Sequence, residues 1–234
     1  MPRSWSVVDF VLVWLGGLMG SAVFTVTGLA LEVDDWLIIV GLIGHYLGIL
    51  VVFWLLSQHK DDPGIGFSVR SRDVTYIGIG LLAQIALALV MLPISNLLLP
   101  DGGPPQVIID IFAEADTVLL RMALVTLAVV MTPITEELVY RGVLLRALQP
   151  RGRRFAIVVS AAVFALIHFD GLDFDRLWQS AVVVLPPIFI LGLLLAWVTE
   201  RQGRLGPAIF IHSGWNLLAA LVLLLPSELL EQAA

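Results

Sequence analysis

Polar side chains at helical spacing could carry out acid–base chemistry in this chain. Glu136 and Glu137 are followed by Arg141, and two imidazoles, His168 and His212, come later in the sequence. Carboxylates and imidazoles are the side chains that most often give and take protons in enzyme reactions. These residue types indicate hydrolysis by an activated water molecule, provided that the fold brings them to one place.

The two adjacent glutamates are expected to have different roles. Glu137 and Arg141 are four residues apart, so in a helix they share a face and can pair, which is the least costly way to hold an arginine in lipid. Glu136 points about 100° away around the same helix and has no partner there. We therefore expect Glu136 to act as the general base and the Glu137–Arg141 pair to have a mainly structural role.

Two further pairs have the same spacing. His212 and Asn216 lie one helical turn apart, and two donors aimed at one point make an oxyanion hole. Phe164 precedes His168 by four residues, so its ring can fix the orientation of the imidazole. The alternative for each residue alone is a hydrogen bond between helices. The whole set at a common depth in the membrane favours a reactive site.

The elements that must position these residues are membrane-spanning helices. Hydrophobic residues make up 59% of the chain and charged residues 14%, and the mean hydropathy is +0.97. A helix needs about 20 apolar residues to cross a bilayer. We expect an all-α polytopic membrane protein, one integral domain over residues 1–234, with about seven transmembrane helices, or eight. The apolar runs are 7–31, 36–56, 74–99, 123–146, 155–171, 178–199 and 205–225.

Helix geometry predicts a common depth for the polar residues. At 1.5 Å per residue, Glu136 lies roughly 15 Å from the inner end of its span, His212 roughly 10 Å and His168 roughly 20 Å. All three then belong to one layer near the middle of the membrane.

The loops between the spans alternate in charge, and arginine and lysine mark the cytoplasmic ones. This predicts a cytoplasmic N-terminus and an external C-terminus. Within residues 100–122, four polar residues recur at intervals of four, three and four, which predicts an amphipathic helix on the outer surface and a fourth span starting near residue 123. These four are Asp110, Glu114, Thr117 and Arg121.

Composition also excludes several classes of function. The chain has no cysteine, so it has no thiolate metal site, disulfide or cysteine nucleophile. Its net charge of −6 comes mostly from the predicted outer loops, which argues against nucleic-acid binding. The partner that the composition indicates is membrane lipid.

Three motifs resemble those of the CAAX prenyl protease 2 family, also called the CPBP or Abi family of intramembrane proteases. They are Glu-Glu-x-x-x-Arg at 136–141, Phe-x-x-x-His at 164–168 and His-x-x-x-Asn at 212–216. Their order and spacing match from about residue 120 to 220, which we expect to be the catalytic core. Residues 1–100 contribute almost nothing to the resemblance.

The resemblance implies an α-helical endopeptidase in the membrane, with a site reached from the cytoplasm. Glu136 and His168 would activate water, and His212 with Asn216 would stabilise the tetrahedral oxyanion. The substrates would be peptides cut near their C-termini, either prenylated or peptide precursors. We expect an integral protein of a prokaryotic plasma membrane.

Two alternatives stay open. Glu136, His168 and His212 could ligate zinc, which would leave Glu137 as the remaining base, although a reaction without a metal is favoured. The fold could also belong to a non-proteolytic membrane scaffold or a bacteriocin self-immunity protein, in which the polar cluster serves packing.

Overall fold

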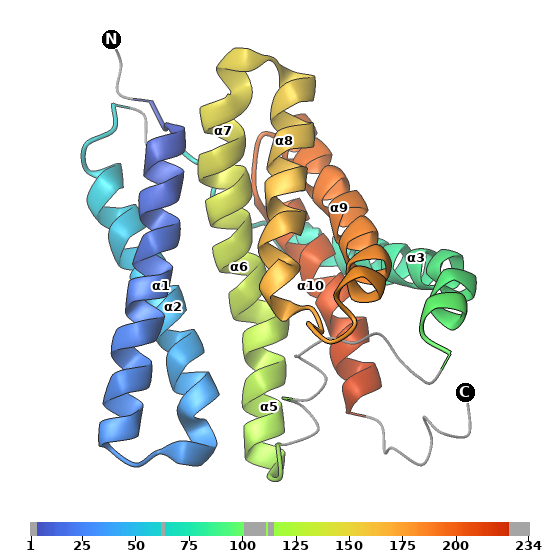
Figure 1. Ribbon diagram of the computed structural model, residues 1–234. Helices are drawn as coiled ribbons and strands as arrows, with labels where there is room; N and C mark the ends of the chain where they lie inside the picture. Colours follow the sequence, from blue (N-terminus) through green and yellow to red (C-terminus); the bar gives the residue numbers. More distant parts are fainter. Residues whose placement is uncertain (1–3, 62–63, 101–110, 112–114, 225–234) are drawn as a thin grey trace.

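The computed structural model describes residues 4–61, 64–100, 111 and 115–224, and every element in this part of the chain is helical. The predicted all-α class is therefore confirmed. The α-helices are α1 Val7–Ala30, α2 Leu37–Ser57, α3 Ile77–Leu98, α5 Val118–Thr126, α6 Thr132–Glu137, α7 Leu145–Leu148, α8 Arg153–Leu166, α9 Leu177–Gln202 and α10 Gly206–Leu223. Short 3₁₀ and π segments extend or join them (Figure 1).

Five helical stretches in the described residues are long and apolar enough to cross a membrane. They are Val7–Ala30, Asp34–Ser57, Ser71–Leu98, Val118–Arg151 and Leu177–Gln202. The other two predicted spans correspond to α8, with 14 residues, and α10, with 18. The chain is thus an integral membrane protein by its helices, while the count of seven or eight spans stays a prediction.

The helix that contains the fourth predicted span starts five residues before the predicted start of that span. The helix begins at Val118, because the Thr117 side chain caps it by accepting a hydrogen bond from the Leu120 backbone N–H at 3.2 Å. Arg121, which the sequence placed on the polar face of a surface helix, belongs to this span and donates from Nε to the Ala115 carbonyl at 2.7 Å. Most of the expected amphipathic segment lies outside the described residues.

The helix with the two glutamates forms the centre of the bundle. Helices α5, α6 and α7 continue one another through two π-helical turns, Leu127–Met131 and Leu138–Leu144. All seven residues of the second turn are buried. In Figure 1 the α1–α2 hairpin stands on one side of this column, and α8, α9 and α10 stand on the other.

Glycines allow close approach of the helices at two crossings. In the α1–α2 hairpin, a Cβ at Gly20 would overlap the Gly44 carbonyl oxygen, and one at Gly48 would overlap that of Gly16. Close packing is therefore the role of these glycines. Helix α3 crosses α10 in the same way, because a Cβ at Gly80 would overlap the carbonyl of Ile211, the residue before His212.

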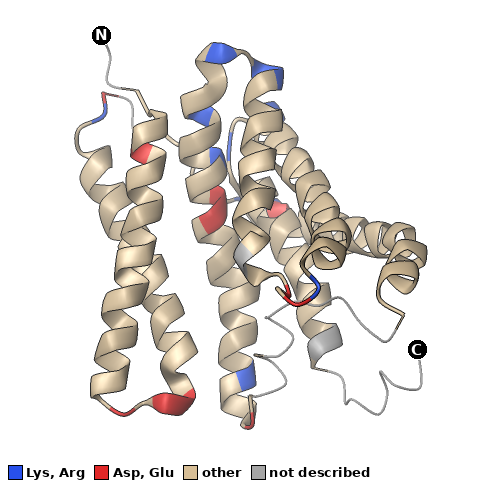
Figure 2. Cartoon of the chain, viewed as in Figure 1, with Lys and Arg blue, Asp and Glu red and all other residues tan. Residues whose placement is uncertain are grey.

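Charged residues gather at the two ends of the bundle. Figure 2 shows arginines at the turn between α7 and α8, and acidic residues at the opposite end, on the turn between α1 and α2 that contains Asp34 and Asp35. At the arginine-rich end, Arg204 forms a two-point ion pair with buried Asp73, which holds the segment before α3 against the α9–α10 turn. The Asp73 carboxylate raises the pKa of Arg204 above its ordinary value.

Candidate active site

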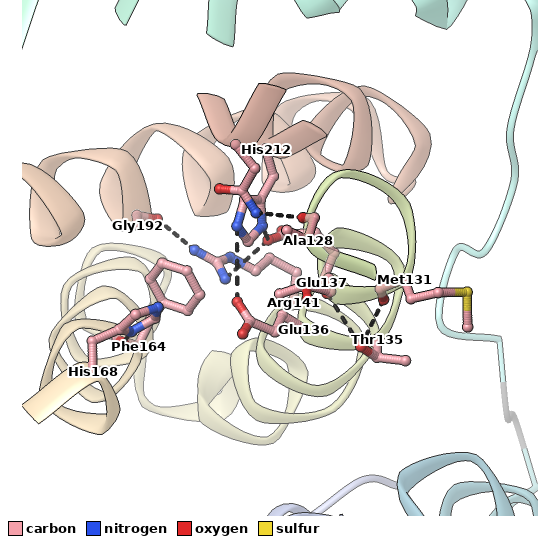
Figure 3. Close-up of polar contacts among 12 residues, drawn as sticks. Ala128, Met131, Thr135, Glu136, Glu137, Arg141, Phe164, His168, Gly192 and His212 are labelled. Carbon is pink, nitrogen blue, oxygen red and sulfur yellow. Dashed lines mark hydrogen bonds and ion pairs between the residues drawn. The ribbon is translucent and has the colours of Figure 1, made fainter. Parts of the chain in front are cut away.

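Glu137 lies at the centre of the polar cluster. Its carboxylate is fully buried, and its Oε1 atom lies 3.2 Å from Arg141 Nη1, so the predicted pair is present. The same oxygen also lies 3.0 Å from His212 Nδ1. This second contact, which joins α6 to α10, did not follow from the sequence. Glu137 therefore orients an imidazole in addition to balancing the arginine (Figure 3).

Arg141 connects several helices from the interior of the bundle. Its guanidinium is fully buried, and Nη2 donates to the Gly192 carbonyl of α9 at 3.2 Å. It also lies over the ring of Phe164 from α8, with 4.3 Å between the guanidinium carbon and the ring centroid. A charge that is paired, hydrogen-bonded and stacked on an aromatic face can be held away from water.

Glu136 has the surroundings expected of a reactive carboxylate. Its side chain is 21% exposed, whereas that of Glu137 is not exposed at all. Glu136 Oε2 lies 3.8 Å from His212 Nε2, the ring nitrogen that faces away from Glu137. One imidazole thus lies between two carboxylates, of which only Glu136 can be reached from outside.

The hydrogen bonds of each histidine fix its role as donor or acceptor. His168 Nδ1 lies 2.8 Å from the Phe164 carbonyl oxygen, which can only accept, so Nδ1 carries a proton. In a neutral ring, Nε2 of His168 then has the lone pair that a base needs. His212 Nδ1 likewise donates to the Glu137 carboxylate, which leaves its Nε2 directed at Glu136.

Phe164 packs between the two imidazoles. Its ring centroid lies 5.0 Å from that of His168 and 5.7 Å from that of His212, both in edge-to-face geometry. The expected contact with His168 is present, and the contact with His212 adds to it. A single buried ring therefore fixes the side chains from α8 and α10 relative to each other.

Asn216 points to the central column. Its Nδ2 atom donates to the Ala128 carbonyl at 2.8 Å. Ala128 lies in the first π turn, where the carbonyl would accept from the residue five positions on, and that residue is Pro133, which has no N–H. One amide proton of Asn216 makes this hydrogen bond in place of the missing backbone N–H. The second amide proton remains available for another acceptor.

Sequence reasoning missed the π turns and the partners they create. The first π turn ends at Met131, directly before Thr132 and Pro133, and the second contains Arg141. Pro133 lies three residues before Glu136, and a proline within a helix indicates an irregular hydrogen-bond pattern because it has no N–H. The sequence therefore contained a signal for the first π turn. The hydroxyl of Thr132 also lies 2.6 Å from that of Tyr46 in α2, a residue that belongs to none of the three motifs.

The residues that could hold zinc do not fit a metal site as they are placed. Among the described residues, no three His, Asp or Glu side chains gather closely enough to share one ion. Glu136 Oε2 lies 3.8 Å from His212 Nε2, but His168 does not join them in a group of three that could share an ion. We therefore derive no step through a metal.

The fold and the cluster together define a class: a helical membrane protein with carboxylates and imidazoles gathered in its interior. Residues 118–218 match the family model of type II CAAX prenyl endopeptidase Rce1-like proteins. The match confirms the resemblance to the CAAX protease and CPBP family over the segment that contains the whole cluster. It supports a CAAX-type protease with a peptide substrate. No curated protein and no solved structure matches the chain.

Proposed function

We propose that this protein is an intramembrane endopeptidase in which Glu136 activates a water molecule without a metal. The proposal rests on the different surroundings of the two glutamates. Glu137 is fully buried and bound to Arg141 and His212, whereas Glu136 is partly exposed and faces the same histidine. The match of residues 118–218 to a protease family supports peptidase activity, and we propose that residues 120–220 form the catalytic core.

The proposed reaction begins at Glu136. Its carboxylate takes one proton from water while the water oxygen attacks the carbonyl carbon of the substrate. Nε2 of His168 accepts a hydrogen bond from the hydrogen that stays on this oxygen. The carbon–nitrogen bond of the tetrahedral intermediate then breaks, and the departing amine takes the proton from Glu136. Buried Glu137 keeps His212 in place, and Arg141 in turn holds Glu137.

The oxyanion of the intermediate is stabilised by donors on α10. Nε2 of His212 can donate when the ring is protonated, and Asn216 has an amide proton beyond the one given to Ala128. Preorganised donors of this kind contribute about 10²–10³ each to turnover. Because both residues are already fixed by bonds to the central column, they need no rearrangement to receive the charge.

The substrate class follows from the setting and from the family. A site among apolar helices suits a peptide that is itself held at the membrane, and the family points to cleavage near a C-terminus that carries a prenyl group or belongs to a peptide precursor. The distribution of charge supports a cytoplasmic location for the arginine-rich end, and we propose that the membrane is a prokaryotic plasma membrane.

The test is cleavage of membrane-bound peptides by purified protein in lipid. A farnesylated peptide, the same peptide without the lipid and a transmembrane peptide would be incubated with wild type, Glu136→Gln and the exposed control Glu32→Gln. We expect wild type and Glu32→Gln to cut at least one peptide at a single bond seen by mass spectrometry. Full activity of Glu136→Gln would contradict the assignment of the base.

A non-proteolytic scaffold is the second candidate, because His212 and Asn216 both make hydrogen bonds within the protein, as packing residues do. A scaffold or self-immunity protein would keep its cellular function in Glu136→Gln. Loss of that function together with cleavage would exclude the scaffold reading.

A further inference from the structure

The hydroxyl groups of Tyr46 and Thr132 form a hydrogen bond between α2 and α6. Their oxygen atoms lie 2.6 Å apart, and Tyr46 is buried, with an exposure of 6%. The segment that matches the protease family model, residues 118–218, does not include α2. The bond therefore links the unmatched N-terminal part of the chain to the helix that carries Glu136.

The hydroxyl of Thr132 is turned out of its own helix. Thr126 and Thr135, in the same central column, each donate to the backbone carbonyl four residues earlier, at 2.8 Å. This is the common bond of a threonine inside a helix. Thr132 departs from the pattern, since its hydroxyl bonds to Tyr46 of the neighbouring helix. The side chain thus joins two helices where its neighbours serve only their own.

The first turn of α6 is held from outside the column on two sides. Pro133 has no N–H, and the Ala128 carbonyl accepts from Asn216 of α10 in place of a backbone donor. Tyr46 binds the same turn from α2 through Thr132. Helix α6 has only six residues and lies between the two π turns. Bonds from two neighbouring helices therefore support a segment whose own hydrogen-bond pattern is irregular at both ends.

Glu136 lies on the same face of α6 as Thr132. The two residues are four apart in an α-helical segment, so one turn separates them, and both are half-buried. The Tyr46 hydroxyl is also close enough to Glu136 to be affected by its charge. Glu136 Oε2 lies 3.8 Å from His212 Nε2. A movement of this turn would change the distance between the carboxylate and the imidazole.

We propose that Tyr46 is a positioning residue, which acts through Thr132 to hold the turn of α6 from which Glu136 reaches His212. The effect on catalysis rests on the proposed peptidase function, in which Glu136 activates water. Rates depend steeply on placement, because a displacement of about 1 Å can lower them about 10²-fold. A single hydrogen bond between membrane helices contributes little to overall stability. Loss of the Tyr46 bond should therefore alter the placement of Glu136 in a protein that still folds.

The first test examines the surroundings of Glu136 without measuring cleavage. Infrared spectra of protein that contains ¹³C-carboxyl glutamate are recorded in lipid, and the difference between wild type and Glu136→Gln isolates the bands of this carboxyl group. We expect Tyr46→Phe and Thr132→Val to shift these bands. Thr126→Val is the matched control, because its hydroxyl bonds within its own helix, and it should leave them unchanged. Unshifted bands in Tyr46→Phe and Thr132→Val would overturn the proposal.

The second test is a double-variant cycle in peptide cleavage. We expect Tyr46→Phe and Thr132→Val each to lower kcat by about 10–10²-fold with little change in KM. The double variant should lower kcat no further, because both substitutions remove the same bond. Thr132→Ser keeps the hydroxyl and should keep most of the activity, and Thr126→Val should match wild type. Effects that multiply in the double variant would overturn the proposal.

The two tests distinguish a failure of this proposal from a failure of the peptidase function. Cleavage by wild type together with unchanged kcat in Tyr46→Phe and Thr132→Val would contradict only the role of Tyr46. A wild type that cleaves no peptide would contradict the peptidase function. The infrared comparison would then decide by itself whether Tyr46 positions Glu136.

Discussion

Glu136 and Glu137 are neighbours in the sequence, but the helix turns them toward different surroundings. Their spacing to Arg141 was enough to predict which one pairs with the arginine, because residues four apart share a helix face. Spacing could not predict that Glu137 also binds His212, since that contact depends on how α10 packs against the central column. Contacts within one helix can be predicted from the spacing of residues in the sequence. Contacts between helices depend on how the helices pack and could not be predicted here.

The buried ion pair gives a prediction about stability. Glu137→Gln should lower the free energy of unfolding by about 3–5 kcal/mol, because it leaves the Arg141 charge without its counterion in the interior. The double variant Glu137→Gln/Arg141→Met should recover part of this loss, since neither charge remains. Thermal unfolding in one detergent would measure both. A double variant less stable than the single one would show that the contacts of Arg141 with Gly192 and Phe164 outweigh the cost of its unpaired charge.

We expect Asn216 to stabilise the fold as well as the oxyanion. Asn216→Ala should lower stability by about 1–2 kcal/mol through loss of the bond to the Ala128 carbonyl. It should also lower kcat by about 10²–10³ with little change in KM, as for a lost oxyanion donor. Kinetics at saturating peptide and thermal unfolding separate the two effects. A stability loss with unchanged kcat would remove Asn216 from the oxyanion hole.

At the scale of elements, the long apolar helices were predictable and their irregularities were not. The runs 7–31, 36–56, 74–99 and 178–199 agree within a few residues with α1, α2, α3 and α9. The π turns on either side of Glu136 and Glu137 were missed, because hydropathy carries no information on the hydrogen-bond register of a helix. The helix of the fourth span starts earlier than the predicted span, because Thr117, which was assigned to a polar face, acts as its cap.

The crossing of α3 and α10 gives a prediction at this scale. Gly80→Ala should separate the two helices and displace the backbone beside His212, because the added Cβ would overlap the Ile211 carbonyl. Gly78→Ala, on the same helix with open space at that position, is the matched control. We expect lower thermal stability and lower cleavage for Gly80→Ala alone. Equal behaviour of the two variants would show that this crossing does not position the site.

At the scale of the whole molecule, the separation of charge predicts the orientation in the membrane. The turn that contains Asp35 should face outward, and the end of α9 at Gln202 should face the cytoplasm. Since the chain has no cysteine, Asp35→Cys and Gln202→Cys each give one thiol for an impermeant reagent applied to intact cells. We expect Asp35→Cys to be labelled directly and Gln202→Cys only after the membrane is opened. The reverse pattern would invert the topology.

The most direct test of the account follows the oxygen of the attacking water. Chelator-treated wild type would cleave a susceptible peptide in H₂¹⁸O under single-turnover conditions, and the new carboxyl group would be analysed by mass spectrometry. Activation of water by Glu136 without a metal predicts undiminished cleavage and one ¹⁸O in the product of the first turnover. Product without ¹⁸O in that turnover would mean that a carboxylate attacks the peptide directly, and loss of cleavage on chelation would place a metal in the reaction.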